Sequence, residues 1–121
     1  MYLDKLFNLK DKVAAVIGAG GHLCSEMAKS FARVGCKVAI IDLRLNKAQQ
    51  VEKEINKEGF NDTISLALDV SRKEDHHKVL KEIINKFGTL DILINGAGTN
   101  GSTPFLEIEE EEWDGIMNSQ I

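Results

Sequence analysis

The sequence predicts an α/β fold built on a doubly wound parallel sheet of about four strands. Three observations predict it: short apolar runs alternate with stretches of helical period, a glycine cluster follows the first run, and an acidic residue ends the second. Right-handed crossovers between parallel strands then place helices on both faces of the sheet. Because no linker or repeat interrupts the pattern, we expect residues 1–121 to form a single domain.

The expected strands are short runs rich in valine, isoleucine and leucine, as is typical of parallel strands buried on both faces. They comprise residues 12–17, 37–42, 64–68 and 90–95. Between them apolar residues recur at helical spacing, and glycine ends the three helices at Gly35, Gly59 and Gly88. A last helix is expected from about Glu109 onward, after a polar loop at 99–104.

Each of the first three helices has an apolar stripe. The first places Leu23, Met27, Phe31 and Val34 on one face, the second Ala48, Val51 and Ile55, and the third Val79, Leu80, Ile83, Ile84 and Phe87. We expect the third stripe to face inward. The same helix should start at a capping box, in which the Ser71 hydroxyl and the Glu74 carboxylate each bond an otherwise unpaired backbone N–H.

Composition excludes several classes of protein. The chain has 15 Lys and Arg against 19 Asp and Glu, so its net charge is −4, and the charges are spread along the sequence. A duplex-binding surface would need clustered basic residues, so no nucleic-acid partner is expected. No apolar run reaches the ~18 residues of a membrane span, and the N-terminus lacks the apolar core of a signal peptide. Cys24 and Cys36 have neither metal-site nor disulfide-framework spacing, so we expect no metal site and a location in the reducing cytoplasm.

The glycine cluster lies where such folds bind phosphate. Small residues let backbone N–H groups approach a pyrophosphate, and the start of the next helix adds partial positive charge. The segment Gly18-Ala19-Gly20-Gly21-His22-Leu23 keeps the first two glycines of G-x-G-x-x-G and has Leu23 at the third. A tight strand-to-helix turn that binds nothing remains the alternative.

Asp42 ends the second strand, 24 positions after Gly18, where a carboxylate can accept hydrogen bonds from an adenosine ribose. It would repel a 2′-phosphate, so NAD is preferred over NADP, although Arg44 keeps NADP as a lesser option. The alternative is a solvated carboxylate at a strand end. An S-adenosylmethionine-dependent methyltransferase would show a similar loop and acid, so these two features do not separate the classes.

The residues after the third and fourth strands do separate them. Asp69-Val70 follows the third strand, and Asn95-Gly96-Ala97-Gly98 follows the fourth. Residues 87–98 are similar almost throughout to the F-G-x-[LI]-D-x-L-V-N-N-A-G of the short-chain dehydrogenase/reductase family, and residues 17–24 to its T-G-x-x-x-G-x-G. The chain resembles this family over nearly its whole length, and less specifically its mannonate oxidoreductase-like branch. The resemblance implies the incomplete N-terminal half of a Rossmann-type fold, with strand order 3-2-1-4.

The resemblance also implies a role for each matching residue. The loop from Gly18 to Leu23 would line the pyrophosphate, Asp42 would hold the ribose, and Asp69 would accept from the adenine amino group. Asn95 would border the cofactor or, alternatively, clamp two strands together. The expected cofactor-binding residues are Gly18, Gly20, Gly21, His22, Leu23, Asp42, Asp69, Val70, Asn95, Ala97 and Gly98.

Three positions depart from the family's glycine loop: Ile17 replaces its threonine, His22 its middle glycine and Cys24 its last glycine. The His22 imidazole could donate a hydrogen bond to a phosphate or obstruct its approach, or it is simply a surface loop side chain. Nothing nearby indicates a reactive thiolate at Cys24, so we interpret this residue as packing.

The family's chemistry needs a tyrosine, a lysine four residues later and a serine. The only tyrosine here is Tyr2, which no lysine follows at that spacing, and Gln120 stands at the position of the supporting asparagine. We therefore expect the cofactor-binding part of an NAD-dependent oxidoreductase that acts on secondary alcohols and ketones, with a polyol or sugar acid as one candidate substrate. A small-molecule substrate is expected only for a full-length parent, and no catalytic residue in this chain.

Two further expectations follow from a half fold. The alternative to an enzyme part is a non-catalytic module that binds a dinucleotide or a partner. The fourth strand (90–95) would be an open, apolar sheet edge, which is a pairing hazard. We therefore expect self-association through this strand or through the last helix.

Overall fold

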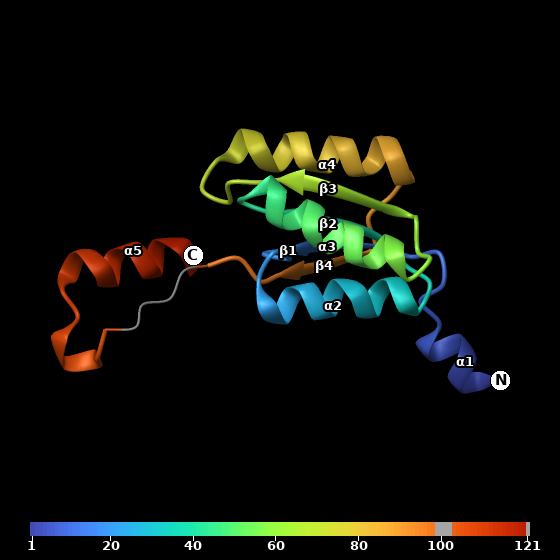
Figure 1. The fold of residues 1–121 in the computed structure, drawn as a ribbon, viewed down its shortest axis with the longest axis horizontal. Coiled ribbons are helices and arrows are strands. Elements are labelled where there is room, and N and C mark those ends of the chain that lie inside the picture. The colour runs from blue at the N-terminus through green and yellow to red at the C-terminus, as the bar shows by residue number, and fades with distance from the viewer. Residues whose placement is uncertain (99–102, 121) are drawn as a thin grey trace.

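The computed structural model describes residues 1–98 and 103–120, with the backbone alone for Gln120. Four strands form one parallel sheet: β1 (Val13–Ile17), β2 (Lys37–Asp42), β3 (Thr63–Ala67) and β4 (Ile92–Asn95) (Figure 1). Their order is β3-β2-β1-β4, which confirms the predicted topology. Part of the predicted loop at 99–104 lies outside the described residues.

Helices cover both faces of the sheet, as predicted for a doubly wound fold. The helices α2 (His22–Arg33) and α3 (Leu45–Lys57) pack on one face, where side chains such as Ala14, Val16 and Ile40 are buried beneath them. The helix α4 (Lys73–Phe87) packs on the other face, over Ala15, Ile41 and Leu66. Alternate residues of β1 and β2 serve the two cores, because successive strand side chains point to opposite faces.

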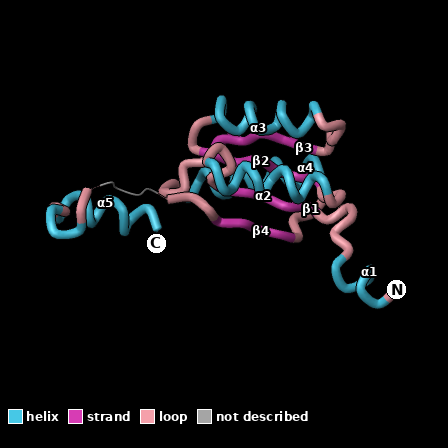
Figure 2. Tube along the Cα trace, turned by 60° about the horizontal axis from the view of Figure 1, so that its bottom comes forward, coloured by secondary structure: helices cyan, strands magenta, loops and turns pink. Residues whose placement is uncertain are grey.

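The remaining helices are α1 (Tyr2–Phe7), the 3-10 turn η1 (Phe105–Glu107) and α5 (Glu110–Gln120). The sequence predicts α5 but neither α1 nor η1. The predicted strand ranges are confirmed to within two residues at each end, and α2, α3 and α4 end within two residues before the predicted glycines. Figure 2 shows β4 at one edge of the sheet, paired with β1 alone.

The predicted apolar stripe of α2 is wrong except at Phe31, which is half-buried and packs against the core. Its buried residues are Cys24, Ala28 and Ala32, whereas Leu23 is 67% exposed. One residue along a helix is a rotation of about 100°, so the small side chains, not the large ones, face the sheet and allow close packing. In α4, similarly, Val79 and Ile83 are buried and Phe87 packs beside them, but Leu80 and Ile84 are exposed.

The predicted capping box is also wrong. The Ser71 hydroxyl donates to the Asp69 carboxylate at 2.6 Å, and no side chain caps α4, whose N-cap residue is Arg72. The hydroxyl bonds Asp69 instead of a helix N–H because Asp69 lies only two residues away. Its carboxylate also accepts the Ser71 N–H and so closes the turn. The helix therefore begins one residue later than the box requires.

Candidate functional site

The loop after β1 has a backbone conformation that requires glycine at its first position. Gly18 has φ +84°, and its N–H donates to the carbonyl of Ile41 at 2.8 Å. Gly21 closes the turn by donating to the Gly18 carbonyl at 3.0 Å. A Cβ on Gly18 would lie 2.8 Å from the Gly96 carbonyl oxygen, so the loops after β1 and β4 touch there. These contacts fix the loop without any ligand.

Asp42 ties the same loop to the end of β2. One carboxylate oxygen accepts from the Gly20 N–H at 3.2 Å, and the other accepts from the Arg44 N–H at 3.0 Å. Asp42 is only 9% exposed, and a Cβ on Gly20 would overlap its carboxylate carbon and the Cβ of Lys47. The sequence predicted that the glycine loop and Asp42 lie at the same edge of the sheet. It did not predict the Gly20–Asp42 hydrogen bond that joins them.

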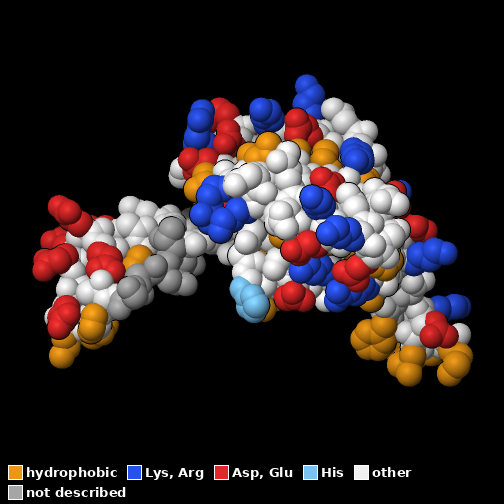
Figure 3. Space-filling view, viewed as in Figure 1, with side chains coloured by type: hydrophobic (Ala, Val, Ile, Leu, Met, Phe, Trp, Pro, Cys, Tyr) orange, Lys and Arg blue, Asp and Glu red, His pale blue; other side chains and the backbone are white. Residues whose placement is uncertain are grey.

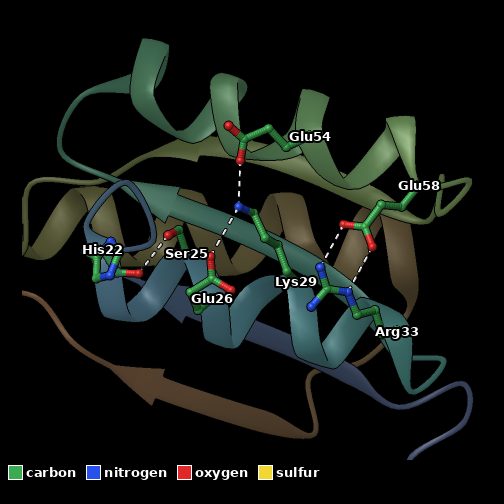
Figure 4. A network of polar contacts seen from close by, with 7 residues as sticks. All are labelled: His22, Ser25, Glu26, Lys29, Arg33, Glu54 and Glu58. Atoms are coloured by element: carbon green, nitrogen blue, oxygen red, sulfur yellow. Dashed lines mark hydrogen bonds and ion pairs between the residues drawn. The ribbon is translucent and has the colours of Figure 1, made fainter.

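The start of α2 is open at the end of this loop. Its N-cap is Gly21, with no side-chain cap hydrogen bond, and its first turn holds no acidic residue. The first-turn N–H groups and the helix dipole therefore favour an anion. His22 and Leu23 are exposed here, and the His22 carbonyl accepts from the Ser25 hydroxyl at 2.9 Å (Figure 4).

The turn after β3 holds Asp69 and Val70 in place. Asp69 accepts hydrogen bonds from both the N–H and the hydroxyl of Ser71, and these bonds hold the pKa of its carboxyl below the ordinary value. The Asp69 N–H donates to Asp75 at 3.1 Å, and a ring nitrogen of His76 donates to the Val70 carbonyl at 2.8 Å. The sequence did not predict the roles of Asp75 and His76. Both come before Val79, the first residue of the apolar stripe, and only the fold shows that they reach back to the turn after β3.

The loop after β4 meets the glycine loop directly. Asn95 ends β4 level with Ile17 of β1, and the Gly96 N–H donates to the Ile17 carbonyl at 3.0 Å. Asn95 and Gly98 are exposed, and Ala97 is half-buried against the core under α4. The structure thus brings the residues after β1, β2 and β4 into contact. It gives no side-chain position for Gln120, whose expected role stays a prediction.

Two clusters of ion pairs fix α2 against α3 (Figure 4). Lys29 lies 2.7 Å from a Glu54 oxygen, and Arg33 forms two hydrogen bonds to Glu58, at 2.9 and 3.1 Å. The hydrogen bond from Lys29 lowers the pKa of Glu54 below its ordinary value of 4.5. Figure 3 shows the mixture of acidic and basic side chains over this part of the surface.

We expect Glu54→Gln to lower stability slightly, because an exposed ion pair contributes at most about 1 kcal/mol. The depressed pKa of Glu54 means that its contribution is present above pH 4.5 and is lost as the pH falls through the folded-state pKa. Urea midpoints of the variant and the unaltered chain should therefore differ near neutral pH and converge once the pH falls below the folded-state pKa of Glu54. A difference that persists in acid would contradict this assignment.

The described residues offer neither a membrane-spanning helix nor a metal site. No described helix combines the length and the apolar character needed to cross a bilayer. In residues 1–98 and 103–120, no three His, Cys, Asp or Glu side chains are grouped to hold a metal ion. Cys24 and Cys36 are both buried and free, and burial raises the pKa of the Cys36 thiol.

The parallel sheet and its strand order define an α/β protein of the Rossmann type. The sequence model of the family described as short chain dehydrogenase matches residues 12–121. The chain belongs to this family. This membership removes the ground for the methyltransferase alternative, which rested on the glycine loop and Asp42 alone.

Curated relatives agree with this assignment. The chain is 39% identical over 105 residues to an uncharacterized oxidoreductase, UxuB, of Bacillus subtilis, covering 87% of this chain and 37% of that protein. It is 35% identical over 118 residues to an NAD-dependent glycerol dehydrogenase of Listeria innocua, covering 98% of this chain and 45% of that protein. The chain therefore spans less than half the length of these relatives.

Solved structures show the same fold. A short chain dehydrogenase from Mycobacterium smegmatis matches with a TM-score of 0.85 at 29% identity, over 94% of this chain and 48% of its own. A 3-ketoacyl-(acyl-carrier-protein) reductase from Brucella melitensis, complexed with NADH, matches with a TM-score of 0.83 at 34% identity, over 93% of this chain and 45% of its own.

Proposed function

We propose that this chain is the cofactor-binding part of an NAD-dependent short-chain oxidoreductase whose whole protein moves hydride between a secondary alcohol and a ketone. The observation that carries the proposal is the glycine loop, held against Asp42 at the open start of α2. The chain's place in the family and an NADH-bound structural neighbour support it. We also propose a reducing cytoplasmic location, in keeping with two free cysteines.

The residues at this edge of the sheet fit a dinucleotide. A side chain at Gly18 or Gly20 would overlap neighbouring atoms, so glycine at both positions keeps the loop close against Asp42 and the loop after β4, beside the helix start where a pyrophosphate is stabilised. Gly21, His22 and Leu23 would supply the first-turn backbone, and Asp69 with Val70 would border the adenine. Asn95, Ala97 and Gly98 would border the nicotinamide half. Bound NAD would supply the hydride acceptor for the alcohol.

Asp42 is proposed to select NAD over NADP. Each of its oxygens already accepts one backbone hydrogen bond, which leaves a second lone-pair direction on each for a ribose hydroxyl. A 2′-phosphate at the same place would face a carboxylate with little water around it. The Arg44 guanidinium, 4.0 Å from Asp42, offers only partial compensation.

Calorimetry with NAD tests the proposal. We expect micromolar binding by the 121-residue chain, weakened about tenfold or more by Asp42→Ala, because a hydrogen bond to a charged group contributes roughly 1.5–3 kcal/mol. Asp42→Asn is the matched control: it keeps an acceptor for Gly20 but loses the charge, so it should bind NADP better than the unaltered chain does. Absence of NAD binding would leave the loop a structural turn and overturn the proposal.

The chain alone is proposed to be inactive as a dehydrogenase. Its one tyrosine, Tyr2, lies in α1 and is exposed. It is far in sequence from the residues proposed to bind the cofactor, which begin at Gly18. We expect no oxidation of NADH with any carbonyl compound, including candidates related to polyols and sugar acids, when followed by the loss of NADH absorbance. Measurable turnover by the pure chain would contradict this prediction.

The open edge of β4 is proposed to pair with a second copy of the chain. Leu93, in the middle of this strand, is 58% exposed. The helix α4 packs over residues of β1, β2 and β3 and leaves this edge of the sheet uncovered. The α5 helix is the second proposed contact, since Trp113 is 49% exposed. In the longer parent, we propose that the rest of the protein covers these surfaces.

A further inference from the structure

Two departures from the family's sequence pattern lie in contact, although they are 72 positions apart. The family has glycine where this chain has Cys24, and asparagine where this chain has Gly96. In the structure, Cys24 lies in the first turn of α2 and is 8% exposed. A Cβ built on Gly96 would overlap the Cys24 sulfur, so a side chain at position 96 requires the present thiol to rotate or move away.

The sulfur alone causes this overlap. The Cβ of Cys24 would lie 3.8 Å from a Cβ at position 96, which is ordinary van der Waals contact. The other close neighbour is the Ile17 carbonyl oxygen at 3.1 Å, which is tight but short of overlap. Removing only the sulfur would therefore relieve most of the conflict.

The backbone around Gly96 has little freedom to move away. Its N–H donates to the Ile17 carbonyl at 3.0 Å, and its own carbonyl lies against Gly18, where an added Cβ would be 2.8 Å away. Gly96 is itself exposed, but the direction of an added Cβ is occupied by the end of β1 and the Cys24 thiol, and its carbonyl lies against the glycine loop. Packing in such a site transmits any added volume to the backbone.

We propose that Cys24 and Gly96 form a matched packing pair that sets the separation between the start of α2 and the loop after β4, the two segments proposed to border the dinucleotide. This inference rests on the proposed function. Cys24 acts here as a positioning residue whose bulk fills the space that glycine at 96 leaves empty. In the family's pattern the bulk lies on the opposite partner, so both departures are explained together.

A double-variant cycle tests the pair. Gly96→Ala should lower the unfolding temperature and weaken NAD binding about tenfold, since overpacking forces side chains and backbone out of their preferred positions. Cys24→Ala alone should have a smaller effect on both. Made in the Gly96→Ala background, Cys24→Ala should instead be favourable. It should restore most of the stability and NAD affinity that Gly96→Ala removes. Gly115→Ala is the control, because a Cβ there meets nothing within 4 Å and alanine is favoured over glycine inside a helix such as α5, so it should leave the NAD affinity unchanged and should not lower the unfolding temperature.

The two measurements separate this inference from the proposed function. Additive losses in the unfolding temperature, measured without ligand, would overturn the matched pair whether or not NAD binds. If Gly96→Ala fails to fold, recovery of folding in the double variant supports the pair, and failure of both overturns it. An unchanged dissociation constant for folded Gly96→Ala would overturn the positioning role. Absence of NAD binding by the unaltered chain would overturn the positioning role together with the proposed function.

Discussion

Gly18→Ala is expected to abolish measurable NAD binding and to destabilise the chain by about 2–4 kcal/mol. Two costs combine at this position. The backbone φ of +84° lies in the left-handed region, which costs an L-residue with a Cβ roughly 1–2 kcal/mol. The new Cβ would also lie 2.8 Å from the Gly96 carbonyl oxygen and 2.9 Å from its carbon, backbone atoms that cannot rotate away. The glycine loop must therefore shift, and its N–H groups with it.

Gly59→Ala separates the two costs. Gly59 has φ +98°, yet a Cβ there meets nothing within 4 Å, so this variant carries the conformational cost alone. We expect it to lose roughly 1 kcal/mol and to keep the NAD affinity of the unaltered chain. Urea unfolding and calorimetry on both variants give the comparison. Equal losses of stability, or an intact NAD affinity in Gly18→Ala, would show that the close approach to Gly96 does not shape the binding loop.

The arrangement of the sheet followed from the sequence because its signals are local. Apolar runs marked the strands, and glycines ended the helices within a residue or two of where the structure ends them. The edge that carries Asp42 and the glycine loop was foreseen for the same reason: parallel strands bring their carboxyl ends together. Signals that depend on competition between neighbours failed. Ser71 bonded Asp69 rather than a helix N–H, and α2 turned small residues toward the sheet.

Contacts between distant residues explain what the sequence missed at the site. The Gly20–Asp42 hydrogen bond and the overlap of Cys24 with a side chain at 96 depend on distances between segments that only the folded chain brings together. The departures Cys24 and Gly96 were visible separately, one in the first strand-to-helix turn and one after the fourth strand. Their meaning as a pair required the packing of α2 over β1 and beside the loop after β4.

The exposed edge of β4 should make the chain self-associate as its concentration rises. Ile92 and Ile94 turn toward the core beneath α2, but Leu93 lies on the opposite side, beyond the reach of α4. Within the described part of the chain, β4 pairs only with β1, so its outer backbone groups are available for another strand. Joining two such edges would cover both the backbone groups and the leucines, and light scattering should show a mass that increases with concentration.

Leu93→Lys is expected to raise the dissociation constant of this association about tenfold or more, because paired edges would bring like charges together across the new interface. Leu80→Lys is the matched control: Leu80 is 46% exposed on α4, away from β4, and its change should leave the association intact. Trp113→Ala tests the second proposed contact, in α5. Association lost in Trp113→Ala but kept in Leu93→Lys would move the interface to α5, whereas a monomer at every concentration would contradict both contacts. If Leu93→Lys gives a monomer and Trp113→Ala does not, the contact is the open edge of β4. The outer backbone groups of that strand then pair with those of a second copy.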